Sequence, residues 1–395
     1  MTAPDYKAPE SVGRLQQRAF AVGGVALVLA VAGWVIKPEA FYHSYIMSYM
    51  LVLGLALGSL GLLMLQHLTS GQWGLLIRRP AEAATRTLPL IFALFVPIIF
   101  GMKTLYFRWM DPAETAKEPL SQMQQWYLTK NHFLLRAAIY FGILFLLVFI
   151  FNRWSREQDV NREDRLLRRR LKMVAGPGII LYVFVLSFAV IDWCMSISPH
   201  WASTIYGFLF VAGQLISSMS LMIAVLVMLA ASEPLASILK KRHLHDLAKL
   251  LFAFNMLWAY FGFSQLLIIW AGNQPEEITF FHSRLYGTWG IVAIIVLIFH
   301  FFVPFFVLLP QDVKRSTRWM PRIAIWMIFM RLVDLFWLTR PEFHLDGVQF
   351  HWLDVVVPVA LVATWLGVFA WNLQQRPLLP LGDPKLAEVT APDEH

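Results

Sequence analysis

Residues 176–199 read GPGIILYVFVLSFAVIDWCMSISP, an apolar run with an acid, Asp192, near its far end. The run is long enough to cross a bilayer as a helix, which takes about 20 residues. An acid at the centre of such a helix costs about 2.5–3.5 kcal/mol on insertion scales, so a retained one usually has a function or a partner. A second run, residues 320–337, ends in the same way with Asp334. The two runs raise the question of whether the chain repeats one unit.

The composition is that of a membrane protein. The chain has 395 residues, of which 58% are hydrophobic and 15% are charged, whereas soluble proteins have about 25% charged residues. The apolar residues fall into runs of about 20, the length of a transmembrane helix. We therefore expect an all-α polytopic membrane protein.

Charge and cysteine content exclude several classes. The net charge is +8, but the basic residues lie in short loops between apolar runs, which indicates membrane topology and not a nucleic-acid partner. Cys194 is the single cysteine. The chain alone therefore has no ligand set for an iron–sulfur cluster and no attachment motif for haem c.

Ten apolar runs are predicted to span the membrane. They cover residues 19–36, 43–66, 88–107, 132–152, 175–195, 203–231, 247–270, 285–309, 319–338 and 355–373. No cleavage-site pattern follows the first run, which is expected to be a retained helix. An even number of spans puts both termini on one side. Most of the 33 Lys and Arg residues fall on that side, so both termini are predicted to be cytoplasmic.

The segments between the spans carry weaker signals. The basic segment 153–172 is predicted to be partly helical, and it is either a solvated loop or a site for anionic lipid or a partner. The outer segment 108–130 is either a docking surface or a plain connector. The tail after Arg376, with its prolines and acids, is predicted to be disordered.

The chain contains an internal repeat. Arg136 and Gly142 in the fourth span match Arg284 and Gly290 in the eighth at one constant offset, and further matches follow in order in the other spans. Asp192 likewise matches Asp334. Spans two to five and six to nine are therefore predicted to form two parallel copies of a four-helix unit, a device known in membrane proteins. The predicted organisation is 1–41 (arm and span one), 42–202 (first bundle), 203–338 (second bundle) and 339–395 (outer loop, span ten and tail).

Polar residues inside the spans suggest a proton path, because protons move along chains of titratable groups and water. We expect ionisable groups near both faces and uncharged ones between. The outer candidates are Lys103, Asp192, Arg331 and Asp334, the middle ones are Gln214 and Ser217, and the cytoplasmic ones are His67, Asn152, Asn255 and His300.

Simpler roles compete with this path. Arg331 and Asp334 are three residues apart on one helix and can pair with each other. Gln214 and Ser217 can serve helix–helix hydrogen bonding, and His67 can be an interfacial histidine. Asp192 has no basic neighbour in sequence, so it is expected to find a partner on another helix, with Lys103 the candidate, or to be protonated. Of the two acids, Asp192 is the one expected to titrate freely.

Two stretches carry a resemblance to a known family. Residues 41–89 begin FYHSYIMSYMLVLGLALGSLG, and residues 187–207 read SFAVIDWCMSISPHWASTIYG. Together with the duplicated unit, they resemble the membrane subunits of the polysulfide reductase family, which bind quinone at the outer face beside an iron–sulfur protein. Within it the chain looks most like the F subunits of alternative complex III, a quinol:electron-acceptor oxidoreductase.

The resemblance implies a subunit of a respiratory complex in the bacterial cytoplasmic membrane. It implies ten helices around two four-helix bundles, contact with lipids, a homologous ten-span partner, and extracytoplasmic partners that hold haem c and iron–sulfur clusters. The redox chemistry is then expected in those partners, with no redox cofactor on this chain and with proton pathways in it. Two alternatives remain: the chain itself binds quinol at the outer face, using His43, His132 and Asp192, or it is a stand-alone secondary transporter built from repeats.

Overall fold

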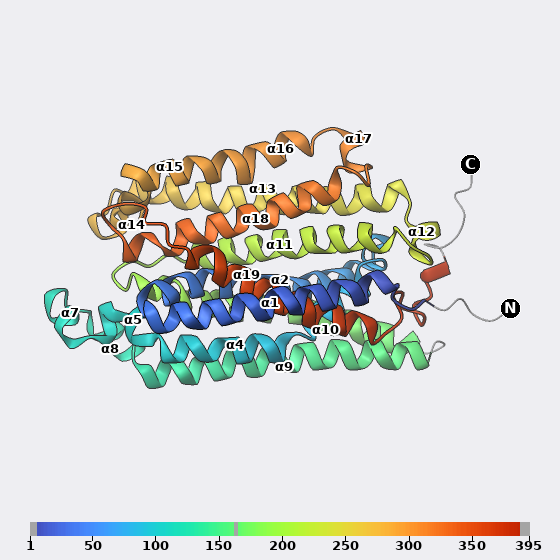
Figure 1. The fold of residues 1–395 in the computed structure, drawn as a ribbon, viewed down its shortest axis with the longest axis horizontal. Helices are drawn as coiled ribbons and strands as arrows, with labels where there is room; N and C mark the ends of the chain where they lie inside the picture. The colour runs from blue at the N-terminus through green and yellow to red at the C-terminus, as the bar shows by residue number, and fades with distance from the viewer. Residues whose placement is uncertain (1–5, 162–164, 388–395) are drawn as a thin grey trace.

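The structure is a computed structural model that describes residues 6–161 and 165–387. Throughout these residues the regular structure is helical and contains no strand. The long helices lie side by side in one bundle, with their axes close to the long dimension of the molecule (Figure 1). The predicted all-α class is therefore confirmed.

Each of the ten predicted spans lies in helical structure. The first five spans correspond in chain order to α1 (Glu10–Ile36), α2 (Pro38–Thr69), α4 (Leu88–Phe100), α9 (Lys130–Val160) and α10 (Arg165–Trp193). The second five correspond to α11 (Ile205–Leu229), α13 (Lys241–Gly272), α15 (Gly287–Ile295), α18 (Met320–Thr339) and α19 (Leu353–Gln374). Shorter helices connect or continue them: η1 (Gln72–Gly74), α3 (Arg78–Thr85), α5 (Met102–Leu105), α6 (Phe107–Met110), α7 (Pro112–Lys117), α8 (Gln122–Tyr127), η2 (Met195–Ile197), α12 (Leu235–Ile238), α14 (Pro275–Leu285), η3 (Val296–Phe302), α16 (Val303–Val307), α17 (Gln311–Lys314) and η4 (Pro341–Phe343).

Nine helical segments within the described part of the chain are long and apolar enough to cross a membrane. They are Glu10–Ile36, Pro38–Thr69, Arg78–Phe100, Lys130–Val160, Leu166–Ile197, Ile205–Leu229, Lys241–Gly272, Gly287–Val307 and Leu353–Gln374. Segments of this length and composition are those of a multi-pass membrane protein. The remaining predicted span, the ninth in chain order, is α18, which has 20 residues and carries Arg322, Arg331 and Asp334.

Two of the predicted spans are broken by local backbone chemistry. Span 88–107 is divided into α4, α5 and α6 at Gly101 and Tyr106, just after Pro97, whose missing N–H weakens the helix. Span 285–309 changes at Val296 from α-helix to the π-helix η3. Such π segments are rare and are found often at functional sites.

Short side chains begin the helices of the predicted outer segment 108–130. Asp111 accepts a hydrogen bond from the Ala113 N–H at the start of α7, and Ser121 and Gln124 form a capping box at α8. Thr129 caps α9. These residues satisfy backbone N–H groups that have no partner within the helix. Helices α7 and α8 project beyond one end of the bundle (Figure 1).

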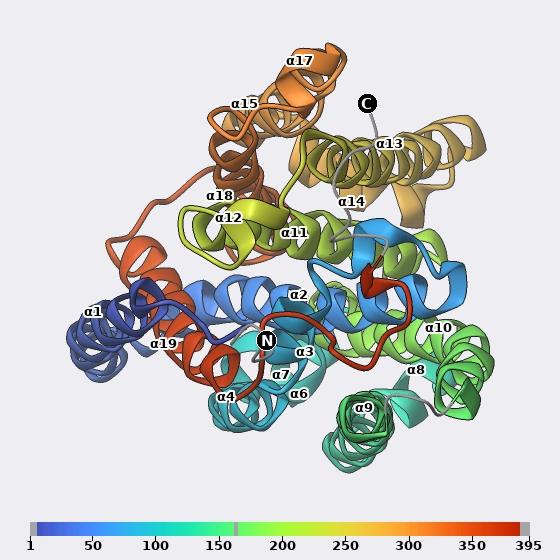
Figure 2. The same cartoon turned by 90° about the vertical axis from the view of Figure 1, so that its right-hand side faces the viewer.

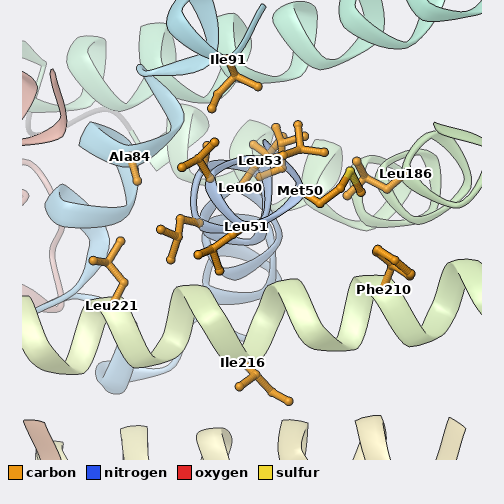
Figure 3. Close-up of a cluster of buried hydrophobic side chains, with 14 of the residues drawn as sticks. Met50, Leu51, Leu53, Leu60, Ala84, Ile91, Leu186, Phe210, Ile216 and Leu221 are labelled. Atoms are coloured by element: carbon orange, nitrogen blue, oxygen red, sulfur yellow. The ribbon is translucent and has the colours of Figure 1, made fainter. Parts of the chain in front are cut away.

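Helix α2 is the centre of the molecule. Every residue from 41 to 64 is buried, as expected for a helix that is apolar all round. Seen from the end, α2 is enclosed by α3, α4, α10, α11 and α19 (Figure 2). Figure 3 shows Met50, Leu53 and Leu60 of α2 pointing to several of these neighbours at once. The predicted units 42–202 and 203–338 therefore share one hydrophobic core.

Small residues allow α2 and α11 to pack closely. A side-chain carbon placed on Gly58 would lie 2.3 Å from the backbone oxygen of Gln214. The Ser218 hydroxyl on α11 donates to the carbonyl oxygens of Gly54 and Leu55 on α2, at 2.9 and 3.0 Å. Helices in lipid associate through such close packing and hydrogen bonds, because lipid removes the hydrophobic drive to associate.

The two ends of the described chain meet at one end of the bundle, which we call the terminal face (Figure 1). There the Leu378 N–H donates to the Tyr6 carbonyl oxygen at 2.7 Å. The prediction of a disordered tail is wrong for residues 377–387. Leu378, Leu379 and Asp383 are buried there, because apolar contacts and ion pairs hold the segment down. Residues 388–395 lie outside the described residues.

Candidate functional site

The most unusual buried cluster begins on α18. Arg331 and Asp334 lie one turn apart, are 2% and 1% exposed, and form an ion pair. The simpler role foreseen for this pair is thus observed. Gly213 of α11 leaves space for the guanidinium, since a side-chain carbon there would lie 2.2 Å from the Arg331 Cζ. The Phe210 ring lies 5.2 Å from the same carbon and supplies a cation–π contact.

The second carboxylate oxygen of Asp334 has no hydrogen bond within the described residues. Asp334 faces Trp258 of α13, and the Trp258 indole N–H is also without a hydrogen-bond partner there. A donor and an acceptor therefore face each other beside a buried ion pair. A small approach of the two side chains would satisfy both groups, as is usual for buried polar groups in proteins.

His300 completes the cluster. It lies in the π-helix η3, is fully buried, and its ring is 4.5 Å from the Trp258 ring in an edge-on arrangement. Neither ring nitrogen has a hydrogen-bond partner among the described residues. Asn255, one turn before Trp258, donates weakly to the Phe301 carbonyl oxygen at 3.4 Å, and its own oxygen is unpartnered.

The structure therefore gathers four predicted path residues, Asn255, His300, Arg331 and Asp334, around Trp258. We call these five the Trp258 cluster. The expectation that His300 lies at the opposite face from the Arg331–Asp334 pair is wrong, because Trp258 contacts both His300 and Asp334. Trp258 was missed from the sequence. Its position one turn from Asn255 on the same helix face was the available signal.

The Trp258 cluster contains two kinds of group that can exchange protons. His300 has two ring nitrogens without a hydrogen-bond partner among the described residues, and Asp334 is a carboxylate paired with Arg331. Ionisable residues at this depth are expensive and are typical of ion and proton pathways. Elsewhere among the described residues, no group of three His, Cys, Asp or Glu side chains is arranged to hold a metal ion.

Asp192, the acid near the end of residues 176–199, has a different environment. Arg136 of α9 donates to both carboxylate oxygens, at 2.8 and 2.9 Å, and the Tyr140 hydroxyl donates at 2.8 Å. The expectation that Lys103 partners Asp192 is wrong, since Lys103 is exposed. The expectation of a partner on another helix is confirmed, and that partner is Arg136. Asp192 is fully buried within a pair supplied by the neighbouring helix.

Arg284, which matches Arg136 in the predicted repeat, makes a parallel set of contacts. Each guanidinium lies over an aromatic ring, at 3.7 Å from Tyr127 for Arg136 and at 3.5 Å from Phe280 for Arg284. Each also donates to the carbonyl oxygen of that aromatic residue. The acid bound by Arg284 is Glu342, at 2.8 Å. Glu342, which was missed from the sequence, and not Asp334, thus occupies the place that corresponds to Asp192.

The residues expected in the middle of the path serve helix packing. The Ser217 hydroxyl donates to the Gly213 carbonyl oxygen of its own helix at 2.9 Å. The Gln214 side-chain oxygen accepts from the Tyr182 hydroxyl at 3.4 Å, while its amide nitrogen is unpartnered. Within the described chain, no hydrogen bond links these two residues to His67 or Asn152.

Asn152 belongs to a buried ionic network at the terminal face. It donates to the Thr85 hydroxyl at 3.0 Å and accepts from Arg376. The network is centred on Glu82, which is 1% exposed and binds Arg78 and Arg79, at 3.2 and 2.6 Å. From the sequence, Arg78 and Arg79 were expected to be loop residues whose charge indicates membrane topology. In the structure both are buried. His67 is beside this network and stacks on Phe151 with a ring distance of 5.6 Å.

The predicted quinone-binding residues are not brought together. His43 stacks on Phe343 with a ring distance of 3.9 Å, and its Nδ1 has no partner among the described residues. His132 is half-buried and its Nδ1 contacts the Trp126 carbonyl oxygen at 2.7 Å. No ring contact or hydrogen bond joins His43 to His132 or Asp192 in the described structure.

These sites rest on geometry alone. Comparison of the chain with models of known protein families and with curated proteins finds no match.

Proposed function

We propose that this chain is an integral membrane subunit of a quinol-oxidising respiratory complex of the alternative complex III type, in the polysulfide reductase membrane-subunit family. The chain holds no redox cofactor of its own, and a proton path runs through it. The observation that carries the proposal is the Trp258 cluster, an unsatisfied histidine beside an ion pair within membrane-spanning helices. The resemblance in residues 41–89 and 187–207 supports the choice of complex.

The proposal includes ten spans built from two four-helix repeats. The helical state of α18 supports counting it as a span in addition to the nine others, because its charges Arg331 and Asp334 neutralise each other. The parallel contacts of Arg136 and Arg284 support the repeat. The meeting of both chain ends at the terminal face supports an even number of spans. The bias of Lys and Arg then makes that face cytoplasmic, in a bacterial inner membrane.

In this proposal the Trp258 cluster is the proton-holding step. In this step His300 takes up a proton. Asp334, which is paired with Arg331, then stabilises the protonated His300 or receives the proton from it. Asp192 and Glu342 keep structural roles, since each is held by an arginine. Quinol oxidation and electron transfer take place in partner subunits that contain haem c and iron–sulfur clusters and in a homologous ten-span subunit.

The first test is what purifies with the chain from its native membrane under mild detergent. We expect haem c absorption, iron–sulfur signals in electron paramagnetic resonance, and quinol oxidation in one particle. Isolation of the chain as a stable monomer that transports a solute would overturn the proposal in favour of a transporter. Quinone-analogue crosslinks to His43 would instead assign quinol binding to this chain.

The second test addresses the proton path. In the reconstituted complex, His300→Gln and Asp334→Asn are expected to lower proton release while the complex stays assembled. His132→Gln is the matched control, because His132 is only half-buried and its contacts are with Trp126, away from the Trp258 cluster. Proton release by both variants equal to that of His132→Gln would remove the Trp258 cluster from the path.

A further inference from the structure

The chain after α19 turns back across the terminal face, onto which Figure 2 looks. We call residues 376–387 the strap. It is held by the Leu378 N–H on the Tyr6 carbonyl oxygen and by the Lys385 ammonium on the Ser70 carbonyl oxygen, at 2.7 and 2.8 Å. The strap therefore joins the N-terminal segment to the end of α2.

Two strap side chains of opposite charge enter the buried ionic network. Arg376 donates to Glu82 at 3.2 Å, and Asp383 accepts from Arg78 at 3.1 Å. Both network partners have other contacts. Glu82 is also held by Arg79 and Arg78, and Arg78 also donates to Ser155 and Gln158. Lifting the strap thus removes one charge of each sign and leaves the charges beneath it paired, which avoids the penalty of an isolated buried charge.

A small cavity lies under the strap. Its volume is about 10 Å³, which is room for about one water molecule. Gln66 and His67 line it from α2, and Asp383 and Lys385 line it from the strap. The side-chain oxygen of Gln66, a residue that is 4% exposed, has no hydrogen-bond partner among the described residues. That oxygen is an acceptor that water entering the cavity would satisfy.

One position shows how closely the strap is seated. A side-chain carbon on Gly382 would lie 1.8 Å from the Gln158 carbonyl oxygen and 3.0 Å from the Asp159 amide nitrogen. Backbone atoms cannot rotate away as side chains do, so any larger residue here must move the strap. Its apolar anchor is short: Leu378 and Leu379 are fully buried, Pro380 is buried, and Leu386 packs against the core.

We propose that the strap is a lid that lifts and recloses over the cavity beside His67, so that it controls the entry of water from the terminal face to Gln66 and His67. The inference rests on the contacts of residues 376–387 and is independent of the proposed function. It assigns the C-terminal segment a gating role in place of a passive one. Short segments with few apolar anchors open with much lower free energies than the core.

The test measures access to the cavity with a thiol reagent. Cys194 is the single cysteine, so in a Cys194→Ser background the variant His67→Cys presents one thiol to a membrane-impermeant maleimide. The labelling rate is expected to be slow with the native strap and about tenfold faster with Gly382→Ala or Asp383→Ala, because each favours the open strap. Gly142→Ala is the matched control, since a side-chain carbon there has no atom within 4 Å.

Equal labelling rates in the native strap, Gly382→Ala and Asp383→Ala would overturn the inference, whether all are slow or all are fast. Hydrogen exchange on the unaltered chain supplies a second readout that needs no substitution. The strap amides of Leu378 and Gly382 are expected to exchange before those of α9. Protection of the strap equal to that of α9 would show a fixed element and would also overturn it.

Discussion

Arg136 on α9 holds the carboxylate of Asp192 on α10 through two parallel hydrogen bonds, from Nε at 2.8 Å and from Nη2 at 2.9 Å. Two-point arginine–carboxylate pairs are among the strongest polar contacts in proteins. Tyr140 adds a third hydrogen bond, at 2.8 Å. An acid that has no base near it in sequence is thus fully satisfied by the helix packed beside it.

We predict that Asp192→Asn lowers the stability of the protein by about 1–3 kcal/mol, because it leaves the Arg136 guanidinium without its acid. The measurement is the free energy of unfolding in detergent micelles, followed by circular dichroism. Glu276→Gln is the control, since Glu276 is exposed. A variant as stable as the control would mean that lipid headgroups or water replace Asp192 for Arg136.

His300 gives the opposite expectation for stability. Because neither ring nitrogen has a hydrogen-bond partner in residues 6–161 and 165–387, His300→Phe removes two unsatisfied polar atoms from a buried site and is expected to be neutral or stabilising by about 1–3 kcal/mol. Proton release by the complex is expected to fall in the same variant. Stabilisation with unchanged proton release would leave His300 without a function in the path.

Gly58→Ala tests the contact between the two halves of the core. The added carbon would lie 2.3 Å from the Gln214 backbone oxygen, so α2 and α11 must separate. We expect a loss of about 1–3 kcal/mol, as for other overpacked sites, measured as thermal unfolding in micelles. Gly142→Ala, with open space around it, should be unchanged or slightly more stable, since alanine favours helix. Equal effects would exclude close packing as the role of Gly58.

Glu342 lies just after α18 and gives a prediction on pH. Burial alone would raise the pKa of its carboxyl, but the guanidinium groups of Arg284 and Arg108 overcome this and hold the pKa below its usual value of 4.5. Below pH 4.5 the unfolded chain therefore binds a proton that the folded chain does not, and stability falls with acidification. The difference in unfolding temperature between the native protein and Glu342→Gln should be constant above about pH 5.5 and shrink below pH 4.5. A constant difference down to pH 3 would contradict the pairing.

Hydropathy alone located the helices of this protein. Each predicted span is helical because a run of about 20 apolar residues can satisfy its backbone in lipid only as a helix. The burial of α2 was also readable, since residues 41–64 are apolar on every side. The breaks within spans three and eight were harder to predict from the sequence. Pro97 is visible in the sequence, but no residue pattern in span 285–309 indicated the π-helix η3.

Ion pairing was decided by tertiary contacts. Asp192 has no partner in its own sequence neighbourhood, because its arginine lies on another helix, and no pattern along one chain specifies which helices face each other. For the same reason the sequence suggested that Arg78 and Arg79 are loop charges, whereas in the structure α3, α9 and the strap enclose them. The Arg331–Asp334 pair was foreseen, since both residues lie on one helix one turn apart.

By itself, then, the sequence determined the helices, their apolar character and which ionisable residues lie within them. Only the tertiary structure decided which of those residues meet. Packing places His300 and Asp334 on either side of Trp258. It pairs Asp192 with Arg136 and Glu342 with Arg284. It also places the strap over the cavity beside His67. The physical reason is range: hydropathy and helix geometry act over a few neighbouring residues, whereas ion pairs and buried hydrogen bonds join segments that only packing brings within reach.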